Sequence, residues 1–321
     1  MKQVLTSLEL CAGAGGQALG LERAGFSHEA LVEIDRDACS TLHLNRPDWS
    51  ILNEDLLSFS GKPYDGIDLL AAGLPCPPFS VAGQQLGERD ERNLFPTFFR
   101  LIDEVRPRAA IIENVKGIMG PKFAEYRQWT QGELRNRGYW SQWSLFEASQ
   151  FGVSQFRQRA VLVAFRDGAE RAFGWPMPSL TLPPTVGDLL FDLINENSWC
   201  GAEEWRSRAS RIAPTIVGGS KKHGGPDLGP TRAREAWRRL GVNGAGLADT
   251  APAIDFCGLP KLTNRMVARI QDFPDDWMFC GGKTTIHRQI GNAFPPAVAE
   301  AIGQQVCKAL VATGASLSRV G

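Results

Sequence analysis

Short apolar runs alternate with amphipathic segments from the start of the chain to about residue 165, and this alternation most constrains the fold. The apolar runs occupy residues 4–10, 31–35, 51–56, 67–72, 109–115, 140–146 and 160–165. Segments typical of helices occupy residues 17–24, 36–44, 94–105 and 122–137. Strands that alternate with helices build a mostly parallel sheet with helices on its faces. The sequence therefore predicts an α/β fold of the Rossmann type.

A glycine-rich turn follows the first expected strand. Residues 11–16 read Cys-Ala-Gly-Ala-Gly-Gly, and Glu33 lies 20 residues after Gly13, the spacing at which an acid meets ribose hydroxyls. A plain tight turn is the alternative interpretation. The turn lacks the Lys-Ser/Thr pair of a phosphate-binding loop, so S-adenosylmethionine fits it better than a nucleoside triphosphate.

Residues 73–80, Gly-Leu-Pro-Cys-Pro-Pro-Phe-Ser, place Cys76 just past the carboxyl end of an expected strand. Open α/β sheets bind their ligands at this edge, and the prolines leave the loop little conformational freedom. Cys76 is therefore a candidate nucleophile, although a buried cysteine in a proline-rich turn would have the same local sequence.

Further polar side chains end other expected strands. Glu113 ends the strand at 109–115 and could assist a base, or it could be a cap or a surface group. Asp55 could face the same crevice, but a turn or cap aspartate is equally compatible with its position. Alternation in an extended segment places Gln155, Arg157 and Arg159 on one face, where the arginines need anionic or carbonyl partners unless the strand is a solvated edge.

The composition changes after residue 165. Prolines occupy positions 176, 178, 183 and 184, and regular patterning returns only at 262. Lys and Arg number nine against two acids between residues 206 and 239, although the whole chain carries no net charge. We interpret residues 176–261 as a small irregular or β-rich domain with a phosphate-binding patch, or alternatively a solvated helix face. Residues 1–175 and 262–321 form the other domain, to which a C-terminal helix returns.

Several classes of protein are disfavoured. No apolar run approaches the roughly 20 residues of a membrane span, and the start lacks a signal-peptide profile. The seven cysteines are scattered without CxxC pairs, which argues against disulfides or a zinc site. We therefore expect a cytoplasmic protein without a structural metal.

Six blocks together resemble those of the DNA (cytosine-5)-methyltransferases, in that family's usual order. They are residues 10–16, 73–80, 113–115, 155–159, 262–277 and 289–296. The resemblance implies an S-adenosylmethionine-dependent methyltransferase domain and, at 176–261, a target-recognition domain. It also implies double-stranded DNA as substrate, possible pairing with a restriction endonuclease, and a monomer.

The resemblance implies roles for individual residues. The residues expected at the cofactor are Leu10, Cys11, Gly13, Gly15, Gly16, Glu33, Ile34, Asp55, Leu56, Pro75, Asn292 and Ala293. Cys11 departs from the phenylalanine of many relatives and offers less stacking surface. The catalytic residues expected are Cys76, Glu113, Arg157 and Arg159. The residues expected at DNA are Ser80, Gln84, Arg89, Lys221, Lys222, Arg232 and Arg234.

Two related functions stay open. A tRNA cytosine-5 methyltransferase would share all six blocks, but its loop characteristically reads Pro-Cys-x-x-Phe-Thr, whereas Ser80 stands here. A catalytically inactive DNA-binding relative would tend to lose Cys76 or Glu113, and both are present. A DNA amino-methyltransferase is excluded because its Asp/Asn-Pro-Pro-Tyr/Phe signature is absent.

Overall fold

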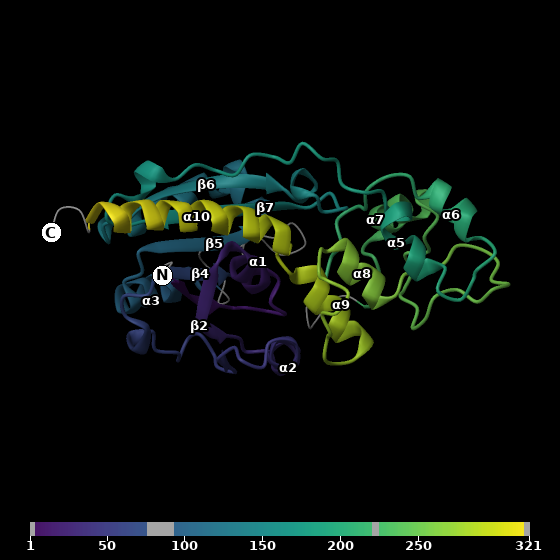
Figure 1. Ribbon diagram of the computed structural model, residues 1–321, viewed down its shortest axis with the longest axis horizontal. Coiled ribbons are helices and arrows are strands. Elements are labelled where there is room, and N and C mark those ends of the chain that lie inside the picture. The colour runs from purple at the N-terminus through teal and green to yellow at the C-terminus, as the bar shows by residue number, and fades with distance from the viewer. Residues whose placement is uncertain (1–3, 76–92, 220–224, 318–321) are drawn as a thin grey trace. The chain divides into compact units, whose positions relative to one another are not determined.

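The computed structural model describes residues 4–75, 93–219 and 225–317, with side chains described as far as residue 313 (Figure 1). The chain divides into two compact units. The first comprises Met1–Phe146, Gln158–Met177 and Val298–Gly321, and the second Glu147–Arg157 and Pro178–Ala297. Residues 262–297 thus cluster with the second unit, whereas the sequence prediction assigns them to the first domain. The reason is a buried hydrogen-bond network that ties them to Gln155 and Arg157.

The described residues of the first unit form a seven-stranded sheet of order β3-β2-β1-β4-β5-β7-β6. The strands are β1 (Leu5–Leu10), β2 (Phe26–Val32), β3 (Ile51–Leu52), β4 (Leu69–Gly73), β5 (Ala109–Val115), β6 (Trp140–Glu147) and β7 (Gln158–Phe165). The strands β1 to β5 pair in parallel, and β7 pairs antiparallel with β5. The predicted mostly parallel α/β sheet is confirmed.

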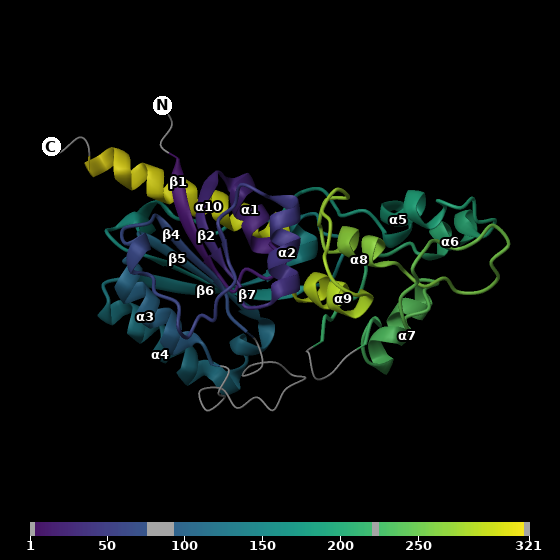
Figure 2. The same ribbon diagram turned by 90° about the horizontal axis from the view of Figure 1, so that it is seen from below.

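Helices cover both faces of this sheet. They are α1 (Gly16–Ala24), α2 (Arg36–Asn45), α3 (Phe95–Val105), α4 (Ala124–Asn136) and α10 (Pro296–Leu317). Figure 2 shows α3 and α4 on one face and α1 and α10 on the other. Alternation along β1 sends Leu8 and Leu10 into a buried cluster with Phe98 of α3. On the opposite face, Gly303 of α10 lies against Leu21 of α1, where a side chain at 303 would clash.

Short 3-10 helices connect these elements. They are η1 (Lys62–Tyr64), η3 (Lys116–Met119), η4 (Pro121–Phe123), η5 (Ala148–Phe151) and η6 (Ala169–Ala172).

The sheet order creates a topological switch point. The chain first runs outward from β1 through β2 to β3, then returns to the other side of β1 as β4. The carboxyl ends of β1 and β4 are therefore neighbours, with Leu10 opposite Ala72. Ligands of open α/β sheets bind at this kind of crevice. The glycine turn and the residues that lead to Cys76 begin here, as the sequence predicts.

The second unit is built from short helices and irregular segments. Its helices are α5 (Val186–Ile194), α6 (Ala202–Arg208), α7 (Thr231–Arg239), α8 (Asn264–Ile270) and α9 (Lys283–Asn292). Between 178 and 297, the described residues enter β-structure only as the isolated bridges Gln155–Ala213 and Ala248–Thr263. The prediction of an irregular or β-rich segment at 176–261 does not include the helices α5, α6 and α7, which form there between irregular stretches. Threonine side chains cap the first turns of two of these helices, α5 and α8; Thr185 does so for α5 by accepting the N–H of Asp188.

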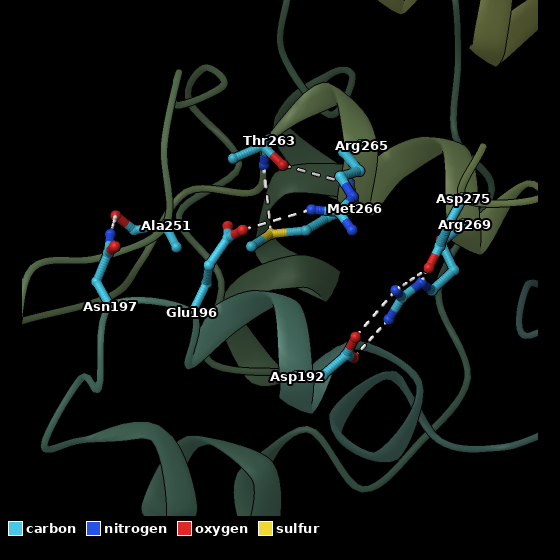
Figure 3. A network of polar contacts seen from close by, with 9 residues as sticks. All are labelled: Asp192, Glu196, Asn197, Ala251, Thr263, Arg265, Met266, Arg269 and Asp275. Carbon is cyan, nitrogen blue, oxygen red and sulfur yellow. Dashed lines mark hydrogen bonds and ion pairs between the residues drawn. The ribbon is translucent and has the colours of Figure 1, made fainter. Parts of the chain in front are cut away.

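An ion-pair cluster joins two of these helices (Figure 3). Arg269 of α8 donates from Nη2 to Asp192 Oδ2 of α5 at 3.0 Å and from Nε to Asp275 Oδ1 at 2.8 Å. Thr263 is the N-cap of α8, and its Oγ1 accepts the N–H of Met266 at 3.3 Å. These contacts fix α8 on α5. No described helix has both the length and the apolar character needed to cross a membrane.

Candidate active site

The glycine turn after β1 forms an open backbone cradle. Gly13 and Gly15 have φ angles of +57° and +88°, a region that disfavours other residues. Apart from Gly13 and its chain neighbours, the described residues place no atom within 4 Å of the position that a Cβ on Gly13 would take. Gly15 N–H donates to Ala12 O at 3.1 Å, and Gly16 then begins α1. The turn therefore leaves space beside its backbone for a ligand.

Glu33, the residue after β2, holds this turn in place through a hydrogen bond. Its Oε2 accepts the N–H of Gly13 and its Oε1 that of Asp35, both at 2.7 Å. Burial raises the pKa of the Glu33 carboxyl, and the Asp35 and Gly13 N–H groups oppose that rise. A carboxylate has about four acceptor positions, so Glu33 keeps capacity for hydroxyl donors. The strand ends at Val32 rather than at the expected Asp35, because Asp35 caps α2 through its Oδ1.

The remaining residues expected at the cofactor differ in exposure. Ile34 is 62% exposed and offers an apolar surface beside Glu33, whereas the Leu10 and Leu56 side chains belong to the core. Pro75 is half-buried. Asp55 Oδ1 accepts the N–H of Leu57 at 2.9 Å, which is the turn role left open by the sequence. An open glycine cradle, an acid with acceptor capacity and an exposed apolar side chain fit an adenosine-containing cofactor.

Cys11 holds a left-handed conformation with φ +55° and is partly buried. Burial, followed by the nearby carboxylates of Glu33 and Asp55, raises the pKa of its thiol above the ordinary value. Cys11 therefore stays protonated at neutral pH and is unsuited to act as a nucleophile.

Glu113 and Arg159 form a buried ion pair at the same edge of the sheet. Arg159 Nε lies 2.7 Å from Glu113 Oε1, and the two side chains are 12% and 7% exposed. Arg159 is opposite Val115 in the β5–β7 register, so it faces Glu113 diagonally. Glu113 is also opposite Gly73, and its Oε2 lies 4.0 Å from the position of a Cβ there. The acid thus lies beside the strand end that leads to Cys76.

Asn114 has a role that sequence reasoning missed. The side chain is fully buried, and its Nδ2 donates to Leu74 O at 3.5 Å, while its Oδ1 accepts the N–H of Val115. It therefore links the end of β5 to the segment that precedes Cys76. The only signal for this role in the sequence is the position of the Asn114 amide directly after Glu113, the acid at the strand end.

Arg157 is 1% exposed and belongs to the second unit. Its guanidinium donates to Ile216 O at 2.8 Å, Gly291 O at 2.7 Å and Ala293 O at 2.9 Å. Gln155 supports it by accepting the N–H of Ile216 at 2.8 Å. Carbonyl partners are one of the two possibilities foreseen from the sequence, and they make Arg157 a positioning residue in this unit.

The segment that Arg157 holds makes a close backbone crossing with α9. A Cβ on Gly291 would lie 2.4 Å from Gly218 N, and one on Gly218 would lie 2.6 Å from Arg288 O. Asn292 Nδ2 donates to Gly219 O at 3.4 Å. Asn292 and Ala293 thus lie in the second unit, and their predicted contact with the cofactor stays a prediction.

Six predicted site residues lie outside the described residues. They are Cys76, Ser80, Gln84, Arg89, Lys221 and Lys222.

Solved structures of methyltransferases share the fold of this chain. Solved structures with the same fold include a methyltransferase of Entamoeba histolytica, EhMeth, with a TM-score of 0.68 and 13% identity over 95% of this chain and 98% of that one. Another is the S. pombe Dnmt2 methyltransferase, with a TM-score of 0.63 and 19% identity over 93% and 97% of the two chains.

The sequence defines the family more closely. The family model of the C-5 cytosine-specific DNA methylases matches residues 5–308. The chain is 53% identical to the Type II methyltransferase M.NgoMIV of Neisseria gonorrhoeae over 95% of this chain and 98% of that protein. It is 51% identical to the Type II methyltransferase M.NaeI of Lentzea aerocolonigenes over 99% and 78% of the two chains. The protein belongs to the C-5 cytosine-specific DNA methylase family.

Proposed function

We propose that this enzyme methylates C5 of a cytosine in a specific short sequence of duplex DNA, as the modification enzyme of a restriction–modification system. The Glu113–Arg159 pair beside Gly73 is the observation that most supports this proposal. It places an acid and a cation at the strand end from which the Cys76 loop departs. The names of the two Type II relatives support a modification role.

Cys76 acts as the nucleophile. Cytosine C5 is a poor nucleophile while the ring is aromatic, so the Cys76 thiolate first forms a bond to C6. The ring electrons move toward N3, and C5 becomes enamine-like and takes the methyl group. Bound S-adenosylmethionine supplies that methyl group as an electrophilic sulfonium. A base then removes the C5 proton, and the electron pair of that C–H bond expels Cys76.

Glu113 and Arg159 stabilise the ring as its charge changes. Glu113 bonds the N3 and exocyclic amine edge of cytosine and supports the charge that develops at N3 on attack. Arg159 bonds O2 and, at 2.7 Å from Glu113 Oε1, orients the acid. Arg157 has a positioning role, through the carbonyls it binds in the second unit. The target base must leave the stack, because C6 is inaccessible within a duplex.

The cofactor is held at the crevice after β1 and β2. The glycine turn, held by Glu33, would face the methionine part of the cofactor. Glu33 would accept hydrogen bonds from the ribose hydroxyls, and the exposed Ile34 would lie against the adenine. Asp55, Pro75, Asn292 and Ala293 are the further residues that we assign to the cofactor.

Residues 176–261 form the target-recognition segment, which lies in the second unit from Pro178 onward. Lys221, Lys222, Arg232 and Arg234 contact DNA from it, and Ser80, Gln84 and Arg89 do so from the loop after Cys76. The enzyme acts as a cytoplasmic monomer on the site that a cognate restriction endonuclease cleaves, without a stable complex between the two.

A methyl-transfer assay tests the proposal. Purified protein is incubated with tritiated S-adenosylmethionine and either mixed-sequence duplex DNA or bulk tRNA, and the labelled product is sequenced after bisulfite treatment. We expect label in DNA alone, confined to cytosines in one short context. Label in tRNA alone would contradict the substrate. Cofactor binding without label in either would favour the inactive DNA-binding alternative.

A further inference from the structure

Helix α7 carries the most concentrated positive charge among the described helices of the second unit. Its nine residues, Thr-Arg-Ala-Arg-Glu-Ala-Trp-Arg-Arg, include four arginines and one glutamate. The whole chain has no net charge, so this excess is local. A basic helix in an otherwise neutral protein indicates an anionic partner.

The helix is firmly anchored on one face. Trp237 is fully buried and Leu240 is 6% exposed, and they lie on the same side because they are three residues apart. Gly241, with φ +75°, ends the helix by donating its N–H to Arg238 O. Arg208 of α6 donates to the same carbonyl at 3.0 Å. The outward side chains therefore project from a fixed backbone.

The outward face is a ring of arginines around one acid. Arg232, Glu235 and Arg239 recur at helical spacing, Arg238 lies one turn after Glu235, and all four are exposed. Glu235 lies 3.7 Å from Arg238 Nη1 and 3.8 Å from Arg239 Nε, longer than a hydrogen bond. The two arginine side chains are 69% and 79% exposed, so solvent screens these pairs and a stronger anion can replace Glu235.

We propose that α7 docks on the DNA backbone, with Arg232, Arg238 and Arg239 binding phosphates and Glu235 weakening that attraction. The inference rests on the proposed function, because it takes duplex DNA as the substrate. It goes beyond the predicted contacts of Arg232 and Arg234 by placing the site on the outward face. Arg234 lies at the edge of that face, with its stem against Gly244. Glu235 repels phosphate and so limits binding to DNA of any sequence.

The test is the salt dependence of DNA binding. Kd is measured against salt concentration on methylatable duplex DNA and on a scrambled duplex, for the intact chain and for Arg239→Ala, Arg238→Ala/Arg239→Ala and Glu235→Gln. Each lost phosphate contact lowers the slope of log K against log salt by about one, equally on both duplexes. Glu235→Gln should tighten binding to both duplexes by roughly two- to fivefold.

The matched controls are Arg265→Ala and Glu196→Gln, which remove the two partners of another exposed ion pair of this unit, 3.5 Å apart. These controls should keep the slope of the intact chain. The inference would be overturned if the arginine variants keep the salt slope of the intact chain, or if the control variants change it by the same amount. It would also be overturned if the slope changes only when tRNA is the ligand. Methyl transfer to DNA is measured on every variant at low salt. If the intact chain methylates DNA but the arginine variants keep its salt slope, only the role of α7 is refuted. If the intact chain does not methylate DNA, the proposed function is refuted.

Discussion

Glu113 Oε1 and Arg159 Nε lie 2.7 Å apart across the antiparallel strands β5 and β7, and both side chains are almost completely buried. Removing either charge would leave the other in a site with little access to water, which is costly. We therefore expect substitutions in this ion pair to reduce the rate of methyl transfer more than the affinity for the cofactor.

Glu113→Gln should reduce turnover by about 10²–10⁴-fold, because the amide cannot stabilise charge at N3 as a carboxyl does. Affinity for S-adenosylmethionine should change little. Single-turnover methyl transfer and equilibrium cofactor binding measure the two effects separately. The control Glu22→Gln removes the acid of a half-exposed ion pair with Arg46 and should leave both unchanged. Equal losses in turnover and cofactor affinity would identify Glu113 as structural.

Cys76→Ser should abolish methyl transfer and preserve DNA binding, because a hydroxyl is far less ionised than a thiol at neutral pH. On DNA with 5-fluorocytosine at the target, the C5–F bond blocks the final elimination of Cys76, and the resulting covalent trapping of the enzyme in a denaturing gel should be lost with Cys76→Ser. Cys200→Ser serves as control, since Cys200 is an exposed free cysteine with no role in the proposed site, and this variant should retain covalent trapping. Substantial turnover by Cys76→Ser would remove Cys76 from the nucleophile role.

Glu9→Gln should stabilise the protein at neutral pH. Glu9 of β1 is fully buried, and Gln17 Nε2 donates to its Oε2 at 3.1 Å. Burial raises the pKa of Glu9 from 4.5 to about 8, so the unfolded chain ionises first and stability falls as pH rises between these values. Each pKa unit is worth about 1.4 kcal/mol, and the variant should avoid a loss of a few kcal/mol.

Denaturant titrations of both proteins at pH 5 and pH 8 measure this effect. The gain from Glu9→Gln should be larger at pH 8, and the exposed Glu29→Gln should show no such trend. Parallel pH profiles for Glu9→Gln and the unaltered chain would contradict the assignment.

Gly291→Ala should destabilise the second unit. The added methyl would lie 2.4 Å from Gly218 N, a backbone atom that cannot move aside cheaply. Overpacking of this kind costs about 1–3 kcal/mol. Gly132→Ala, in α4 with no atom within 4 Å, should instead stabilise by about 0.5–1 kcal/mol. Thermal unfolding of both variants checks the contrast, and a neutral Gly291→Ala would show that the crossing can relax.

Local sequence predicted most of the first unit. Apolar runs indicate burial and glycine turns indicate backbone freedom. The sequence therefore predicts β1, β4 and β5 correctly, and it predicts Glu33 at the same site as Gly13. The role of Asn114 depends on a carbonyl 40 residues away, and that of Arg157 on carbonyls 59 and 134 residues away. Such distant pairings leave no periodic signal, which is also why the assignment of residues 262–297 to the first domain differs from the compact units.

The crossing of Gly218 and Gly291 links the proposed target-recognition segment to one of the six blocks that resemble those of the family. Residues near 218 belong to the segment expected to vary with the DNA target, whereas Gly291 lies in a block shared with the family. Because the two backbones touch, neither position can gain a side chain without change at the other. A segment transplanted from a relative to alter the target sequence must therefore bring a glycine in register with 218, or exchange the end of α9 together with it.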